Sequence, residues 1–232
     1  MNNVVKNTMI KWLLDLVCPH ICMNCGEVGE ILCECCENNM LFSQKMVCPL
    51  CKQEVDAGRC SECDLPFSAL FVVGWREGVL AKLTKDYKYR SLRAAGEVLA
   101  DCLAWRIGER LEGEEVLVVP LPTIGKHIRQ RGFDHTADLS RKLAARKGWE
   151  YLEVLGRATD AVQVGANMQK RQEQAAKTYC TLRQFDLYKT LLLVDDVWTS
   201  GASMLAAAKV LREAGAKKLV AGVIMTGKPE DE

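Results

Sequence analysis

The stretch Leu191–Ser203, read as L-L-L-V-D-D-V-W-T-S-G-A-S, decides the fold of this chain. Four consecutive apolar residues without polar alternation are typical of a strand buried on both faces, like the central strands of a parallel sheet. Two carboxylates, Asp195 and Asp196, follow directly, and the turn Thr199–Ser203 then opens a segment with a helical pattern. Because ligands bind where loops separate at the carboxyl ends of parallel strands, we expect a ligand site in this turn.

The residue types in the turn favour a phosphorylated sugar. Backbone N–H groups, three hydroxyls and the positive end of the following helix would together attract a phosphate, and Gly201 lets the backbone approach it closely. Carboxylates repel phosphate but accept hydrogen bonds from sugar hydroxyls, so the acid pair indicates a ribose. We therefore predict a phosphoribosyl ligand held by Asp195, Asp196, Thr199, Ser200, Gly201, Ala202 and Ser203. In the alternative, an aspartate merely caps the following helix, which requires one acid rather than two.

This stretch resembles the signature of the type I phosphoribosyltransferases, which runs hydrophobic strand, D-D, two residues, T-[ST]-G-x-[ST]. Neither a Walker P-loop nor a Rossmann glycine pattern occurs in the sequence, which argues against an ATPase or a dehydrogenase. The resemblance implies an α/β fold with a parallel sheet flanked by helices. It also implies that Asp195 and Asp196 are the catalytic residues and that the ligand is phosphoribosyl pyrophosphate (PRPP) with Mg²⁺.

A second apolar run, Glu115–Pro122, also ends in a loop with charged side chains. Lys126, His127, Arg129 and Arg131 follow within a few residues and could offset much of the charge of a pyrophosphate. The alternative is a basic turn exposed to water. In type I phosphoribosyltransferases the loop after this strand receives the pyrophosphate, so the resemblance assigns that role to Pro122, Thr123, Ile124, Gly125 and Lys126.

From Val119 onward the chain also resembles the ComF competence proteins. The run V-P-L-P, a basic loop and R-Q-R-G-F-D-H is similar to the family pattern V-P-x-P, a basic loop and R-x-R-G-F-N-Q, with Asp134 and His135 in place of Asn and Gln. The run Q-V-G-A-N-M-Q-K-R from Gln163 to Arg171 resembles the family's Q-x-G-L-x-x-x-x-R. The resemblance implies a cytoplasmic protein of DNA uptake and natural transformation that handles single-stranded DNA, with other DNA-uptake proteins as partners.

Eight of the twelve cysteines form four C-x-x-C pairs, a spacing typical of metal sites rather than of disulfides. The pairs are Cys22 and Cys25, Cys33 and Cys36, Cys48 and Cys51, and Cys60 and Cys63. We predict two structural zinc ions, each on four thiolates, since few large apolar residues lie here to form a core without metal. Short loops favour sequential pairing, although spacing alone leaves a cross-braced pairing open. Iron–sulfur binding fits the regular pairs less well. Thiolate metal sites also fit a reducing cytoplasm.

The distribution of apolar residues divides the chain into three parts. Residues 1–17 carry apolar side chains on one helical face but also Lys6, Lys11 and Asp15, so we expect an amphipathic docking helix rather than a membrane span. Contact with a membrane surface is the alternative. Residues 18–66 then form the zinc-binding module, and residues 67–232 form the phosphoribosyltransferase-like domain.

A basic stretch with interleaved tyrosines predicts a further surface. Aromatic rings stack on bases while cations follow phosphates, so we expect single-stranded DNA at Lys82, Lys85, Tyr87, Lys88, Arg90, Arg129 and Arg131. A solvated helix face is the alternative, and the formal net charge of +1 gives no strong nucleic-acid footprint. The chain is thus a phosphoribosyl-binding protein of DNA uptake or an active phosphoribosyltransferase, for which the sequence indicates no acceptor. A zinc adaptor that docks other proteins is a third alternative.

Overall fold

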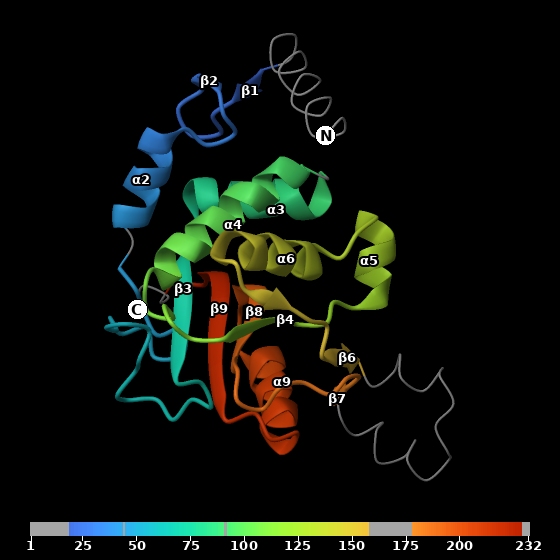
Figure 1. Ribbon diagram of the computed structural model, residues 1–232. Helices are drawn as coiled ribbons and strands as arrows, with labels where there is room; N and C mark the ends of the chain where they lie inside the picture. The colour runs from blue at the N-terminus through green and yellow to red at the C-terminus, as the bar shows by residue number, and fades with distance from the viewer. Residues whose placement is uncertain (1–18, 44, 91, 158–177, 229–232) are drawn as a thin grey trace.

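A computed structural model shows the fold and describes residues 19–43, 45–90, 92–157 and 178–228 (Figure 1). Its centre is a five-stranded sheet in the order β3-β9-β8-β4-β5, and every pair of neighbouring strands runs parallel. The strands are β3 (Ala69–Trp75), β4 (Val116–Pro120), β5 (Glu150–Tyr151), β8 (Thr190–Trp198) and β9 (Lys218–Thr226). The middle strand is β8, as its apolar run Leu191–Val194 predicts.

Helices cover both faces of the sheet (Figure 1). One side carries α3 (Gly78–Tyr89), α4 (Arg93–Ile107) and α6 (His135–Lys147), and the other carries α9 (Ala202–Glu213). The alternation along β8 decides which side each residue meets. Leu192 and Val194 pack in the α3, α4 and α6 core, whereas Leu191 and Leu193 pack against α9. The predicted class, a parallel sheet flanked by helices, is confirmed.

Two smaller pieces complete the domain. The short helix α5 (Gly125–Arg131) follows β4, and β6 (Leu155–Arg157) pairs with β7 (Tyr179–Thr181) in an antiparallel ribbon. The ComF-like run Gln163–Arg171 and the predicted helix at 1–17 lie outside the described residues.

β8 is longer than its apolar run. Asp195 and Asp196 lie within the strand rather than after it, because β9 continues beside β8 and pairs Asp195 with Val223 and Trp198 with Thr226. The acid pair therefore rests on sheet backbone rather than on a loop.

The cysteine-rich segment packs against the domain. It contains β1 (His20–Ile21), β2 (Val28–Gly29) and α2 (Glu34–Ser43), and buried residues such as Leu32 and Leu41 join the core formed with α4. The buried Arg106 guanidinium donates to the carbonyl oxygens of Leu41 at 3.3 Å and Val73 at 2.7 Å, which joins the segment to β3. The predicted boundary between residues 66 and 67 stays a prediction.

Within the described ranges, no helix is both long enough and apolar enough to cross a membrane.

Candidate functional site

The candidate site lies at the carboxyl edge of the sheet, where β4 and β8 end side by side. The predicted pyrophosphate loop, residues 122–126, leaves β4, and the predicted phosphate turn, residues 199–203, leaves β8. The fold thus brings both predicted loops to one edge, as expected for neighbouring parallel strands.

The phosphate turn, residues 199–203, is open to solvent on one side and packs against the Trp198 side chain on the other. Thr199, Ser200 and Ser203 are exposed, and α9 begins within the turn at Ala202. Gly201 has a left-handed φ of +77°, and a Cβ there would lie 2.2 Å from Cζ2 of the buried Trp198. Only glycine fits this position, because a side chain would be strained and would also collide with the indole. The turn therefore presents its hydroxyls and the amino terminus of α9 to solvent, while the buried Trp198 side chain packs against Gly201.

Strand alternation separates the two aspartates. Asp196 points to the α3 and α6 side, where its carboxylate forms an ion pair with Lys88 and lies 3.6 Å from Nε2 of His135. Asp196 is only 5% exposed, whereas Asp195 remains partly exposed. Asp195 is therefore partly accessible to a ligand, whereas Asp196 is already paired within the protein.

The surroundings move the pKa values of the two acids in opposite directions. Burial and the neighbouring charge of Asp196 raise the pKa of Asp195 well above its ordinary value, although the Asp196 N–H donates to Asp195 Oδ1 at 2.8 Å. Burial alone would raise the pKa of Asp196 as well, but the hydrogen bond with His135 and the charge of Lys88 hold it below its ordinary value. The negative charge of the pair therefore rests on Asp196, and Asp195 is the acid that a nearby cation would ionise.

The ComF-like motif, residues 129–135, holds the predicted pyrophosphate loop through Asp134. The Asp134 carboxylate caps α6 by accepting from the N–H groups of Thr136 and Ala137, both at 3.1 Å, and it accepts from the Thr123 hydroxyl at 2.9 Å. Thr123 belongs to the predicted pyrophosphate loop, so the helix cap also holds that loop. An asparagine oxygen can accept in the same way, which explains how this position tolerates the departure from the family pattern.

The histidine of the same motif joins Asp196 to a basic side chain. Arg131 Nη1 donates to Nδ1 of His135 at 2.9 Å, and the other ring nitrogen faces Asp196. Sequence reasoning missed both His135 and Lys88 as partners of the acid pair. The chain gave no local signal for them, because α3, α6 and β8 are far apart in sequence.

The predicted pyrophosphate loop is only partly held by the protein. Ile124 and Lys126 are exposed, and α5 begins at Gly125. The Pro122 carbonyl oxygen accepts from Arg157 Nη1 at 3.3 Å. Lys126 has no ion pair within the described ranges, so its charge is available to an anion.

Two of the residues predicted to bind nucleic acid, Tyr87 and Lys88, have side chains that face into the protein. Tyr87 is 0% exposed, and its hydroxyl lies 2.8 Å from both the His135 carbonyl oxygen and the Asp138 carboxylate. The prediction that a base stacks on Tyr87 is therefore wrong, because its ring is packed in the core. Lys88 is engaged with Asp196 rather than presented to solvent. The spacing of Leu80, Leu83 and Tyr87 as one apolar stripe was the signal that could have revealed this.

The exposed aromatic residue of this region is Tyr89. Its side chain is 66% exposed, and the Arg131 guanidinium lies over the ring, 5.1 Å from its centroid. The predicted residues Lys82 and Lys85 are exposed on α3, Arg90 directly after it and Arg129 on α5. Lys82 also donates to the Met23 carbonyl oxygen at 3.2 Å, and Arg90 pairs with the Asp86 carboxylate at 3.4 Å. We call Lys85, Tyr89, Arg90, Lys126, Arg129 and Arg131 the α3–α5 surface.

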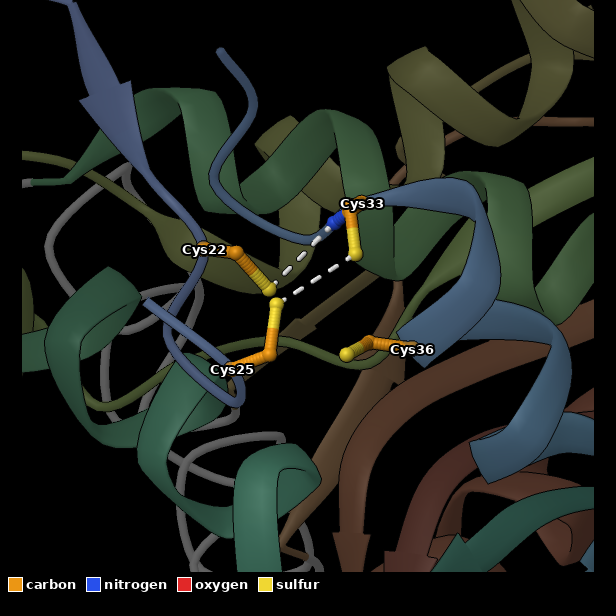
Figure 2. Close-up of side chains that lie close together, drawn as sticks. All are labelled: Cys22, Cys25, Cys33 and Cys36. Atoms are coloured by element: carbon orange, nitrogen blue, oxygen red, sulfur yellow. Dashed lines mark hydrogen bonds between the residues drawn. The ribbon is translucent and has the colours of Figure 1, made fainter. Parts of the chain in front are cut away.

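The eight predicted metal ligands form two separate groups. Cys22, Cys25, Cys33 and Cys36 make one, and Cys48, Cys51, Cys60 and Cys63 make the other, with all four sulfur atoms of each group within 4.8 Å of one another. Figure 2 shows the first four side chains converging on a common centre. The pairing is therefore sequential, and the cross-braced alternative is excluded.

The spacing of the sulfur atoms fits a tetrahedral ion. Four Zn–S bonds of about 2.3 Å place neighbouring sulfurs about 3.8 Å apart. Cys25 Sγ lies 3.7 Å from Cys33 Sγ, and Cys51 Sγ lies 3.6 Å from Cys60 Sγ. Both groups thus have the ligand chemistry and the dimensions of a zinc site.

Comparison with known proteins finds similarity to a curated protein and to solved structures. No family model matches the chain. The competence protein ComFC of Streptococcus pneumoniae (strain ATCC BAA-255 / R6) is 25% identical over 197 residues, which cover 80% of this chain and 83% of that protein. Two solved structures are each 20% identical over 60% of this chain: the allosteric regulatory enzyme of purine biosynthesis, with a TM-score of 0.42, and the glutamine PRPP amidotransferase of B. subtilis, with a TM-score of 0.41. The chain spans 30% of the length of each of these structures.

Proposed function

We propose, from the likeness of this chain to a competence protein, that it is a protein of DNA uptake that binds PRPP with Mg²⁺ at residues 195–203. We further propose that it binds single-stranded DNA on the α3–α5 surface and acts in the cytoplasm. The observation that carries the proposal is the open turn at residues 199–203, with its exposed hydroxyls, beside the partly exposed Asp195.

Each part of PRPP has a matching group at the carboxyl edge. The 5′-phosphate would lie in the turn against the hydroxyls and the amino terminus of α9. The ribose hydroxyls would donate to Asp195, and the pyrophosphate would lie near Lys126. Asp196 would act differently, holding Lys88 and His135 in place beneath the ribose rather than contacting it.

Mg²⁺ fits the oxygen-rich chemistry of this edge, since it prefers carboxylate and phosphate oxygens. Asp195 is the residue that would hold it, together with the ligand's own oxygens. When bound, the ion would neutralise pyrophosphate charge and favour the ionised form of Asp195.

The α3–α5 surface combines an exposed aromatic ring with several cationic side chains, and this combination, rather than the net charge of the chain, supports DNA binding. Tyr89 is exposed and is held by Arg131, so its ring can take a stacked base while neighbouring cations follow the phosphates. This surface adjoins the carboxyl edge, because Arg131 also contacts His135 and His135 faces Asp196. A DNA strand and a phosphoribosyl ligand would therefore meet at neighbouring positions.

Zinc is the metal that we propose for both cysteine groups, in a structural role. Four thiolates without an open position are typical of structural zinc sites. Metal analysis of protein purified without added zinc should give two zinc ions per chain, and an iron chromophore would contradict the assignment.

The alternative function is an active phosphoribosyltransferase with an unknown acceptor. The observation in its favour is that both the phosphate turn and the pyrophosphate loop are present at one edge. Such an enzyme would release pyrophosphate from PRPP when its acceptor is added. A screen of candidate acceptors for pyrophosphate release separates it from a binding protein, which would release none.

A thermal-shift experiment tests the proposed function. The midpoint of unfolding should rise with PRPP plus Mg²⁺ and, independently, with a single-stranded oligonucleotide. PRPP without Mg²⁺ should give a smaller rise. No rise with PRPP and Mg²⁺ would remove the phosphoribosyl part of the proposal, and no rise with DNA would remove the other part.

A further inference from the structure

A second pocket lies at the opposite end of the sheet from the candidate site. Its volume is about 440 Å³, within the range of small-molecule sites. Its walls include Ala69, the first residue of β3, and Lys218, the first residue of β9. Because β3 is seven residues long, about 20 Å of strand separates this amino edge from the carboxyl edge. We call it the amino-edge pocket.

Two arginine side chains that line the pocket, Arg59 and Arg110, are available to bind a ligand. Glu114 pairs with Lys218 and accepts from the Thr190 hydroxyl, so these charges are already satisfied. Arg59 and Arg110 line the pocket, and neither side chain has a hydrogen bond or an ion pair within the described ranges. One carboxylate, that of Asp56, stands against these two cations. The excess of positive charge among these side chains favours binding of an anion in the pocket.

An unusual turn positions Arg59. The turn from Asp56 to Arg59 is closed by a hydrogen bond from the Arg59 N–H to the Asp56 carbonyl oxygen at 2.9 Å, and Ala57 in it has a left-handed φ of +50°. A non-glycine residue in this region is strained, and such strain persists where the surrounding structure fixes it. Gly58 provides the fixing contact, since its carbonyl oxygen accepts from the Leu70 N–H at 2.8 Å. The turn is thus held on the outer edge of β3, with Arg59 at the mouth of the pocket.

The inner wall of the pocket is apolar. Phe71, Leu111 and Val220 line it, and all three are buried residues of the domain core. A ligand that fits both walls therefore has an anionic group for the arginines and an apolar part for the interior. Guanidinium groups match phosphate oxygens in geometry as well as in charge.

We propose that the amino-edge pocket binds a small phosphate-bearing organic anion, with Arg59 and Arg110 as its charge partners. The ligand contacts both the cysteine-rich segment, through Arg59, and the sheet domain, through Arg110. Binding therefore strengthens the attachment of one to the other. This site is separate from the PRPP site and does not depend on it.

Calorimetric titration of the full zinc-loaded chain with adenosine 5′-monophosphate tests the proposal. Arg59→Gln and Arg110→Gln should each weaken binding at least fivefold, because each removes a charged partner of the phosphate. Both side chains are exposed, so the variants should fold and keep their zinc. Arg76→Gln is the matched control, since it removes an exposed arginine beyond the other end of β3 and should leave the affinity unchanged. Adenosine, which has no phosphate, should bind at least tenfold more weakly.

Three results would overturn the proposal. The first is parent-like affinity in either glutamine variant at Arg59 or Arg110. The second is an affinity that falls with Asp195→Asn but not with Arg59→Gln, which would place the nucleotide at the carboxyl edge. The third is equal affinity for adenosine and its monophosphate.

Discussion

At the residue scale, the two neighbouring aspartates have different surroundings and therefore different roles. Asp196 is enclosed by Lys88 and His135, whereas Asp195 stays partly open at the carboxyl edge. Removing Asp196 would leave Lys88 beside a neutral group in a mostly buried position. Removing Asp195 would break no ion pair, because the negative charge of the two acids rests on Asp196. One acid thus stabilises the fold, and the other is available to a ligand.

The first prediction follows from this difference. Asp196→Asn should lower the free energy of unfolding by about 3 kcal/mol, because a buried charge loses its partner. Asp195→Asn should leave it unchanged or raise it slightly, because burial and the charge of Asp196 disfavour ionised Asp195. Urea unfolding of the two variants and the parent measures both effects. Equal destabilisation by the two substitutions would contradict the assigned roles.

The second prediction concerns pH. The raised pKa of Asp195 means that a proton occupies it more readily than an ordinary carboxyl group, and a bound Mg²⁺ would expel that proton. Affinity for PRPP with Mg²⁺ should therefore rise with pH through the titration of Asp195 and fall as the pH drops below it. Calorimetry in two buffers of different ionisation enthalpy measures the protons released. Asp195→Asn should release fewer, and equal release by parent and variant would argue against this linkage.

The sequence pattern identifies the acid pair but not the different surroundings and roles of Asp195 and Asp196. The D-D pattern and the hydroxyl turn are contiguous in the chain, so their chemistry can be read directly. The partners of Asp196 come from α3 and α6, and only the fold brings them to β8. Such contacts depend on packing between distant segments, which one sequence does not encode locally.

At the scale of elements, helix α3 shows how one helix serves two purposes. Its buried face carries Leu80, Leu83 and Tyr87, spaced at helical intervals, and its last residue, Tyr89, turns outward beside Arg131. Read as a linear motif, the basic stretch favours Tyr87 as the stacking residue. The helical period separates two tyrosines that are only two residues apart, since neighbours at that spacing face different directions.

The third prediction uses these two tyrosines as a matched pair. Tyr89→Ala should weaken single-stranded DNA binding by about 1–3 kcal/mol if a base stacks on the ring. Tyr87→Phe should leave DNA binding unchanged, because the ring is buried, while lowering stability through the lost hydroxyl contacts. Fluorescence anisotropy with a labelled oligonucleotide measures both. If about three phosphates are neutralised, the slope of log affinity against log salt should be near −2.

Loss of DNA binding in Tyr87→Phe with none in Tyr89→Ala would contradict the outward placement of the surface. Binding that ignores both salt and Tyr89 would leave the α3–α5 surface as a solvated face.

The elements that carry the candidate site could be predicted from sequence patterns. The apolar runs at 115–122 and 191–194 indicate β4 and β8, because buried strands need uninterrupted apolar residues, and the helical pattern after the turn indicates α9. The continuation of β8 through the acid pair could not be predicted. It depends on hydrogen bonds to β9, a strand that pairs with it only after folding.

At the scale of the whole molecule, the second cysteine group covers an open edge of the sheet. β3 is an edge strand, and Gly58 accepts a hydrogen bond from its Leu70 N–H. Lys52, next to Cys51, donates to the hydroxyl of Thr226, the last residue of the neighbouring strand β9, at 3.0 Å. Exposed edges pair readily with other chains, so this cover protects against aggregation.

The fourth prediction compares the two cysteine groups. Cys51→Ser should remove the second zinc ion, release the cover from β3 and cause concentration-dependent association. Cys25→Ser is the matched control, since it disrupts the first group, which contacts α3 rather than the β3 edge. Light scattering across a concentration series, with metal analysis of each variant, measures the effect. Equal association of both variants would show that zinc loss in general, rather than edge exposure, is responsible.

The metal groups themselves could be predicted from spacing, but their placement could not. Four C-x-x-C pairs define ligand chemistry within a short segment, whereas the contact of Gly58 with Leu70 depends on a left-handed turn and a close approach of two backbones. No pattern in the sequence distinguishes a free zinc module from one that covers a sheet edge.

The central claim is that the carboxyl edge binds PRPP with Mg²⁺ through Asp195 and the phosphate turn. Calorimetric titration of the parent, Asp195→Asn and Asp101→Asn tests it most directly, since Asp101→Asn is a control that removes a partly exposed carboxylate of α4, one that pairs with Arg146. We predict that Asp195→Asn weakens binding about tenfold or more, from the loss of one charged hydrogen bond, while Asp101→Asn matches the parent. Parent-like affinity in Asp195→Asn, or no binding by the parent at all, would contradict the account.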